Sequence, residues 1–112
     1  MSKKMIGDIM REAQKLQAEM QRIQEEVKAK TVEATSGGGM VTVVVNGGGE
    51  LVSIKIERDV INPDDVEMLQ DLILAAVNEG IRKAQEMMNE SMSKFTMGMQ
   101  IPGIGGLGNI LR

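Results

Sequence analysis

The chain of 112 residues contains no cysteine, no histidine, no tryptophan and no tyrosine, and its single aromatic residue is Phe95. Without cysteine there is no disulfide framework and no thiolate chemistry, and without histidine there is no imidazole base or metal ligand. The shortage of aromatic side chains also removes the platforms on which proteins stack unpaired bases. These absences argue against thiol- or histidine-dependent enzymes and against single-strand stacking proteins.

Long apolar runs are absent as well. No window approaches the ~18 consecutive apolar residues of a membrane-spanning helix, and charge appears early, at Lys3, Lys4 and Asp8. We therefore expect a cytoplasmic protein with no membrane partner. The net charge of -3 disfavours a simple basic nucleic-acid binder. Residues 1–30, however, carry seven basic and five acidic side chains, so this segment is the positive end of the chain.

A heptad pattern runs through residues 7–28 and predicts one helix of about 33 Å. Its apolar residues recur at alternating steps of three and four, which is the a/d pattern of a coiled coil. A compact domain of roughly 100 residues has a radius near 13 Å and is too small to cover such a helix. We therefore expect a second copy of the chain to cover this apolar seam, which comprises Ile6, Ile9, Ala13, Leu16, Met20, Ile23 and Val27.

Three strand-like segments follow, at residues 31–35, 40–45 and 51–56. They alternate in polarity or are rich in β-branched residues, and glycines 37–39 and 47–49 separate them. Because such glycines supply the positive φ angles of tight turns, we expect a three-stranded antiparallel meander. The middle segment has little polar surface. We therefore expect both of its faces to be covered, one by a helix and one by a partner.

The tetrapeptide Asn62-Pro63-Asp64-Asp65 predicts the start of a second helix. It offers an N-cap, a proline at the first helical position and two acids near the positive end of the helix dipole. Apolar residues then keep a helical period and occupy more than one face up to Val77. We therefore expect the first half of this helix to be the more deeply buried half.

Residues 97–112 are rich in glycine, have no period and predict a flexible tail after a domain of residues 1–96. The tail contains the pattern G-x-G-x-x-G at Gly103, Gly105 and Gly108. Dinucleotide-binding glycines lie between a strand and a helix. The position of this pattern four residues from the last residue therefore argues against a nucleotide site.

Acidic residues offer one alternative function. Asp64, Asp65 and Glu67 could hold a divalent metal or serve a hydrolytic site, but the charged first turn of a helix explains them more simply. We therefore expect no enzymatic activity, no cofactor, no bound metal and no small-molecule substrate.

Basic residues on the first helix point to a nucleic acid. Lys4, Arg11, Lys15 and Arg22 fall on one outward side and form what we call the basic stripe. A solvated, salt-bridged exterior would explain the stripe as well. In a dimer, however, the stripe occurs twice and can neutralise several phosphates, which dominates nonspecific DNA affinity. The candidate DNA-binding residues are the stripe together with Lys3, Arg82, Lys83 and Lys94.

The chain resembles the YbaB/EbfC family of small nucleoid-associated bacterial proteins. The resemblance rests on IMREAQKLQAEMQ at residues 9–21, GGGMVTV at 37–43 with VNG at 45–47, and EMLQDLI at 67–73 with AAVN at 75–78. Glu57-Arg58 departs from the Asp-Pro pair that the family often has after the third strand.

The resemblance implies an α+β protomer of order α-β-β-β-α and a tweezer-like homodimer. It also implies binding of duplex DNA in the nucleoid with weak or broad sequence preference and no cofactor. It marks the helical ends as the DNA-facing parts and carries Arg11, Lys15 and Arg22 over as contact residues. The alternative function is that of a dimeric coiled-coil adaptor for another protein.

Overall fold

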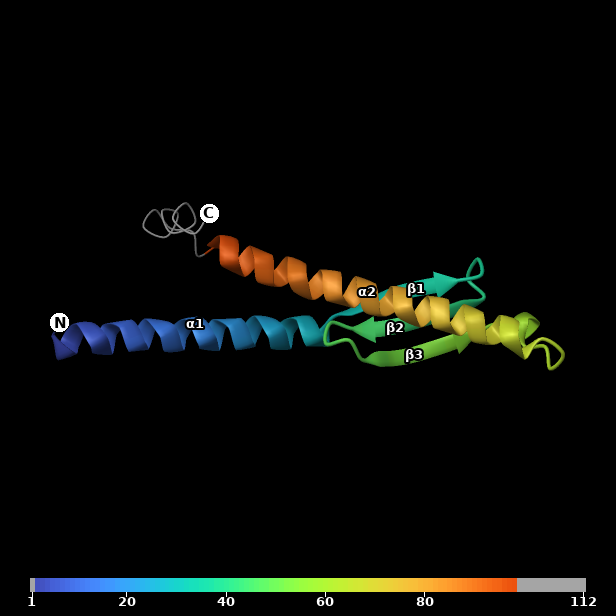
Figure 1. Cartoon of the computed structure of the whole chain (residues 1–112), viewed down its shortest axis with the longest axis horizontal. Coiled ribbons are helices and arrows are strands. Elements are labelled where there is room, and N and C mark those ends of the chain that lie inside the picture. Colours follow the sequence, from blue (N-terminus) through green and yellow to red (C-terminus); the bar gives the residue numbers. More distant parts are fainter. Residues whose placement is uncertain (1, 99–112) are drawn as a thin grey trace.

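The computed structural model describes residues 2–98, which form two long helices and one small sheet (Figure 1). The elements in chain order are helix α1 (Lys3–Ala29), strands β1 (Thr31–Ser36), β2 (Val41–Asn46) and β3 (Leu51–Ile56), the short 3-10 helix η1 (Arg58–Val60) and helix α2 (Val66–Gly98). The strands form one antiparallel sheet in the order β1-β2-β3. The predicted α-β-β-β-α arrangement is therefore confirmed.

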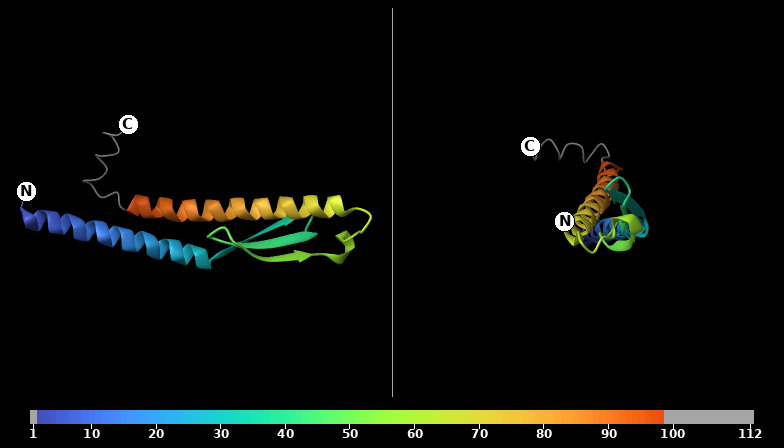
Figure 2. Two further views of the ribbon diagram at one scale, coloured as in Figure 1. Left: turned by 60° about the horizontal axis from the view of Figure 1, so that its bottom comes forward. Right: turned by 90° about the vertical axis from the view of Figure 1, so that its right-hand side faces the viewer.

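The molecule is long and thin, with extents of 75 × 27 × 17 Å and a radius of gyration of 21.4 Å. The expectation of a compact domain is therefore wrong. The reason is visible in Figures 1 and 2: α1 runs away from the sheet, and the second half of α2 continues in the same direction beyond it. Only the sheet and the part of α2 that crosses it form a core.

Helix α1 begins four residues earlier than predicted because Ser2 caps it, its hydroxyl oxygen accepting a hydrogen bond from the Met5 amide at 3.3 Å. The apolar seam of α1 is covered at one end only. Val27 is 2% exposed, whereas Ile9 is 57% exposed and Leu16 is 39% exposed. Within one chain, most of the seam therefore lacks the cover that its pattern requires.

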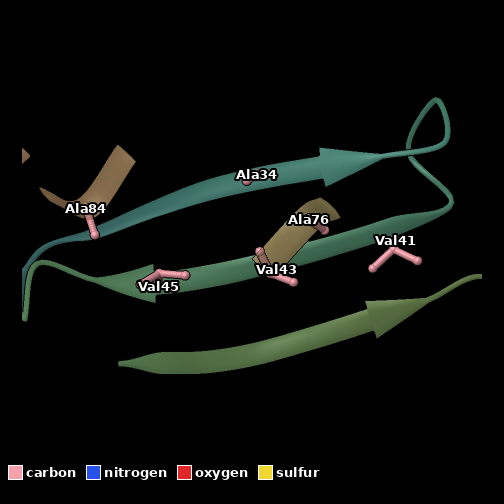
Figure 3. Packing of buried hydrophobic residues seen from close by; sticks show 6 residues of the cluster. All are labelled: Ala34, Val41, Val43, Val45, Ala76 and Ala84. Carbon is pink, nitrogen blue, oxygen red and sulfur yellow. The ribbon is translucent and has the colours of Figure 1, made fainter. Parts of the chain in front are cut away.

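The core lies where α2 crosses β1 and β2 (Figure 3). Ala76, Gly80 and Ala84 of α2 pack against buried residues of the sheet, namely Ala34, Val41, Val43 and Val45. The first half of α2 is the more buried half, as predicted, since it holds Ala76 and Gly80, two of the three buried residues of the helix. It is not buried all round, however, because Val66 and Leu74 are exposed. Burial follows the crossing point, where small residues let the helix approach the strands closely.

The start of α2 also differs from the prediction. Asn62 caps a tight turn instead of the helix, since its side-chain oxygen accepts from the Asp64 amide at 3.0 Å. Asp65 is the residue that precedes the helix, and its carboxylate accepts from the Met68 amide at 3.2 Å. The predicted helix start is therefore too early, because the proline belongs to the turn. At the other end, α2 runs to Gly98 and includes the first two residues of the predicted tail; residues 99–112, with the glycine pattern, lie outside the described part.

The glycine-rich turns serve two different purposes. Gly37, Gly38 and Gly39 have φ angles of 60°, 67° and 95°, as expected of a tight turn. In the second turn, among the glycines only Gly49 has a positive φ, of 84°. Gly47 is needed for a close approach instead: its amide donates to the Lys30 carbonyl at 2.9 Å, and a Cβ there would lie 2.5 Å from Val27 Cγ1. This contact holds the end of α1 against the sheet.

Strand β3 pairs only with β2, and α2 lies over β1 and β2 instead of over β3. The uncovered apolar side chains on and just after β3 form what we call the second apolar surface, made of Leu51, Val52, Ile54 and Ile61, all exposed. On β2, Val41, Val43 and Val45 are buried under α2, whereas Thr42, Val44 and Asn46 are only partly buried. One chain therefore covers one face of the middle strand, and the covering of the other face by a partner stays a prediction.

The approach of α2 to the sheet can be tested at Gly80. A Cβ there would lie 2.7 Å from Val45 Cγ2 and 3.0 Å from Val43 Cγ2. We expect Gly80→Ala to lower the free energy of unfolding, because overpacking costs about 1–3 kcal/mol and exceeds the ~1 kcal/mol gained in helix propensity. Urea unfolding followed by circular dichroism measures the change. Gly7→Ala is the control, since a Cβ on this α1 residue meets nothing within 4 Å. A more stable Gly80→Ala chain would contradict the packing described.

Candidate nucleic-acid interface

The basic stripe of α1 is accompanied by acids along most of its length. Arg11 pairs with Asp8, and Lys15 Nζ lies 3.9 Å from a Glu12 carboxylate oxygen. Arg22 pairs with both Glu19 and Glu26. All of these pairs join residues three or four apart on the same helix, where side chains are neighbours. Three of the four stripe residues are therefore ion-paired with a carboxylate of their own helix.

The Arg22 pairs have a measurable electrostatic consequence. Hydrogen bonds from the Arg22 guanidinium hold the pKa of Glu19 below its usual range, and Glu19 together with Glu26 raises the pKa of Arg22. Both sides of the cluster are therefore charged at neutral pH, with one cation against two carboxylates. A phosphate that approaches Arg22 meets a net negative charge.

The three candidates on α2 lie in different surroundings. Arg82 is placed like Arg22, between Glu79 and Glu86, and it lowers the pKa of Glu79. Lys83 Nζ donates to the Glu33 carbonyl of β1 at 3.0 Å and so fastens α2 to the edge of the sheet. Lys94 Nζ lies 3.7 Å from a Glu90 carboxylate oxygen.

The eight candidate residues therefore do not form one patch. Lys3 and Lys4 lie at the far end of α1, away from the sheet, and Lys83 lies at the β1 edge. Lys94 lines a hollow between the helices together with Glu19, Ile23 and Lys30. The most positive helical segment is residues 2–17, which carries four basic and two acidic side chains, Asp8 and Glu12.

The acidic candidates Asp64, Asp65 and Glu67 all lie at the start of α2. Among the described residues, no group of three or more acidic side chains comes together as a metal site would require, so Asp64, Asp65 and Glu67 form none. No buried side-chain nitrogen or oxygen within residues 2–98 lacks a hydrogen-bond partner. None of the helices described has the length and apolar character needed to cross a membrane.

Sequence reasoning missed two lysines and one set of amides. Lys28 lines a hollow of about 580 Å³ between α1, the β2–β3 turn and α2, together with Gln24, Gln85 and Asn89. Lys30 lies just after α1 and lines the hollow that contains Lys94. The amides could have been found from the sequence. The spacing of Gln14, Gln17, Gln21 and Gln24 repeats the three-four pattern of the seam and so places these four residues on one other side of the helix.

Comparison with known proteins gives a consistent result over nearly the whole chain. The family model described as the YbaB/EbfC DNA-binding family matches residues 2–99. A nucleoid-associated protein of Thermodesulfovibrio yellowstonii is 62% identical over 110 residues, covering 98% of this chain and 96% of the relative. A nucleoid-associated protein of Acetivibrio thermocellus is 56% identical over 100 residues, covering 88% of each chain. The crystal structure of an uncharacterized protein of Helicobacter pylori is 30% identical, with a TM-score of 0.66, and the match covers 87% of this chain and 97% of that one.

Proposed function

Because this chain belongs to the YbaB/EbfC DNA-binding family, we propose that it binds duplex DNA in the bacterial nucleoid as a homodimer, with weak or broad sequence preference. The names of the relatives from Thermodesulfovibrio yellowstonii and Acetivibrio thermocellus support the location. The observation that carries the proposal is the match to the family model over residues 2–99, together with the positive first half of α1.

The mode of binding follows from the charge distribution. The first half of α1 projects from the sheet and has a net positive charge. An exposed cationic helix neutralises phosphates, and phosphate contacts position a protein on DNA without reading its bases. A protein that makes mainly such contacts discriminates little between sequences.

The homodimer follows from surfaces that one chain leaves uncovered. The apolar seam is exposed over most of its length, and the second apolar surface is exposed around β3. Monomeric soluble proteins seldom expose contiguous apolar patches of this kind. A second copy of the same chain supplies matching apolar residues for both.

We expect the affinity for duplex DNA to fall steeply with salt, because each neutralised phosphate releases counterions. The plot of log K against log[salt] should slope by roughly -0.9 per phosphate neutralised. Fluorescence anisotropy with two unrelated duplexes of equal length, at several salt concentrations, measures the slope and the sequence preference together. A chain that does not bind either duplex at low salt would refute the function, and a preference of more than about tenfold, or 1.4 kcal/mol, would refute the broad specificity.

A further inference from the structure

Helix α1 has one largely polar side on which no carboxylate lies between two lysines. At 100° per residue, Gln14, Gln17, Gln21 and Gln24 fall on one side of the helix, and Lys3 and Lys28 fall on the same side at its two ends. All six side chains are exposed except Gln24, which is half-buried. Glu25 lies at the border of this side, which we call the amide face.

The contrast with the basic stripe is electrostatic. The ion pairs formed by described residues of α1 all involve Asp8, Glu12, Glu19 or Glu26, which lie along the stripe. A DNA backbone laid against the stripe would bring phosphates close to those four carboxylates. Against the amide face it would meet Met10 and then neutral amide donors, with a positive charge at each end.

The spacing of the two lysines matches duplex DNA. Lys3 and Lys28 are 25 residues apart, which in a straight helix corresponds to about 37 Å of axis and a rotation within about 20° of a whole number of turns. One turn of B-form DNA measures about 34–36 Å. A helix laid along the duplex can therefore reach the same strand with both lysines, one turn apart.

The amide face also continues beyond α1. Gln24 and Lys28 line one hollow together with Gln85 and Asn89 of α2 and with the glycines of the β2–β3 turn. The turn itself is held firmly, since the Asn46 side-chain oxygen accepts from the amides of Gly48 and Glu50 at 2.9 and 3.0 Å. Polar amides thus surround Lys28 at the sheet end of the face.

We propose that the amide face of α1, with Lys3 and Lys28 at its ends, is the surface that contacts the phosphate backbone of duplex DNA. The glutamine amides donate hydrogen bonds to phosphate oxygens, a role that glutamine serves in many protein–DNA complexes. Lys3 and Lys28 each neutralise a phosphate. The ion-paired residues of the basic stripe lie beside this contact, not in it. This inference rests on the proposed function, because it assumes that duplex DNA is the ligand.

The first test places carboxylates on the amide face. Gln17→Glu combined with Gln21→Glu changes two exposed positions without changing side-chain length. We expect duplex affinity to fall at least ~10-fold at fixed salt, because two carboxylates would then face phosphates. Gln70→Glu combined with Asn78→Asp is the matched control, since it adds the same two charges at exposed positions of α2. The control should retain affinity within about threefold, equivalent to ~0.7 kcal/mol.

The second test removes cations in matched pairs. Lys3→Gln with Lys28→Gln should reduce the magnitude of the salt slope by about 1.8 for each protomer that contacts the DNA, from two phosphates at about 0.9 each. Arg11→Gln with Lys15→Gln removes the same charge from the ion-paired stripe and should leave the slope nearly unchanged. Circular dichroism should show the same helix content in every variant.

The outcomes separate the two proposals. If the unmodified chain does not bind duplex DNA, both the function and the amide face are refuted. If the unmodified chain binds, and the Gln17/Gln21 variant binds as tightly as its control, the amide face is refuted while the function stands. A salt slope that falls only with Arg11 and Lys15 would place the contact on the basic stripe instead.

Discussion

Replacing Gly47 by alanine should lower the free energy of unfolding by about 3 kcal/mol, near the upper end of the cost of overpacking. A Cβ on Gly47 would overlap the Val27 carbonyl oxygen and lie 2.6 Å from its carbon. No change of rotamer relieves a clash with backbone, so the turn or the end of α1 must move. Any such shift also weakens the hydrogen bond from the Gly47 amide to the Lys30 carbonyl.

Gly48→Ala is the matched control for this prediction. Its Cβ would meet the flexible Lys28 side chain at 3.1 Å, which can move away. Urea unfolding at one fixed protomer concentration measures both variants, because the stability of a dimer depends on concentration. Since whole proteins are stable by only about 5–15 kcal/mol, the Gly47 loss should shift the midpoint clearly. Equal midpoints for the two alanine variants would show that α1 and the β2–β3 turn do not approach as closely as described.

A charge on either uncovered apolar surface should dissociate the proposed homodimer. Leu16→Glu places a carboxylate on the apolar seam, and Leu51→Glu places one on the second apolar surface. Leu16 and Leu51 are 39% and 48% exposed in one chain, so the protomer can tolerate the charge. Burial of an unpaired charge in an interface is costly, so each variant should shift the population towards the protomer. Sedimentation equilibrium at micromolar concentration should then report the mass of one protomer, 12.2 kDa, instead of the mass of two protomers.

The control for dissociation is Gln70→Glu, an exposed α2 position outside both surfaces. This variant should sediment like the unmodified chain. An unmodified chain that sediments as a single protomer would refute the homodimer. A dimer that withstands one of the two leucine replacements would remove that surface from the interface.

The sequence predicted the order of elements because their signals are local. The alternation in residues 51–56 marked β3 with its observed bounds, and the heptad pattern marked α1 to within a few residues. The start of α2 was misplaced because Asn62 and Pro63 suit a turn as well as a helix, and only the hydrogen bonds of Asn62 and Asp65 distinguish the two. The local sequence therefore does not show whether Asn62 and Pro63 form a turn or start the helix.

Long-range features were less accessible. The apolar density of residues 66–77 predicted burial, but burial depends on where α2 crosses the sheet, which centres on Gly80. The exposed β3 surface likewise results from the position of α2 over β1 and β2. For the candidate site, composition identified the positive end of the chain. The pairing of Arg22 with both Glu19 and Glu26 depends on the Arg22 rotamer, which the sequence does not specify.

The attachment of α1 at one end makes it a lever. The contact between Val27 and Gly47 is the fulcrum of this lever. Its arm is the part of α1 from Val27 to Lys3, which is about 36 Å long. A tilt of about 5° at the fulcrum carries the tip through roughly 3 Å, close to the rise between successive base pairs. The junction beside the sheet, far from the tip, therefore sets the angle at which the arm meets a rod-shaped ligand.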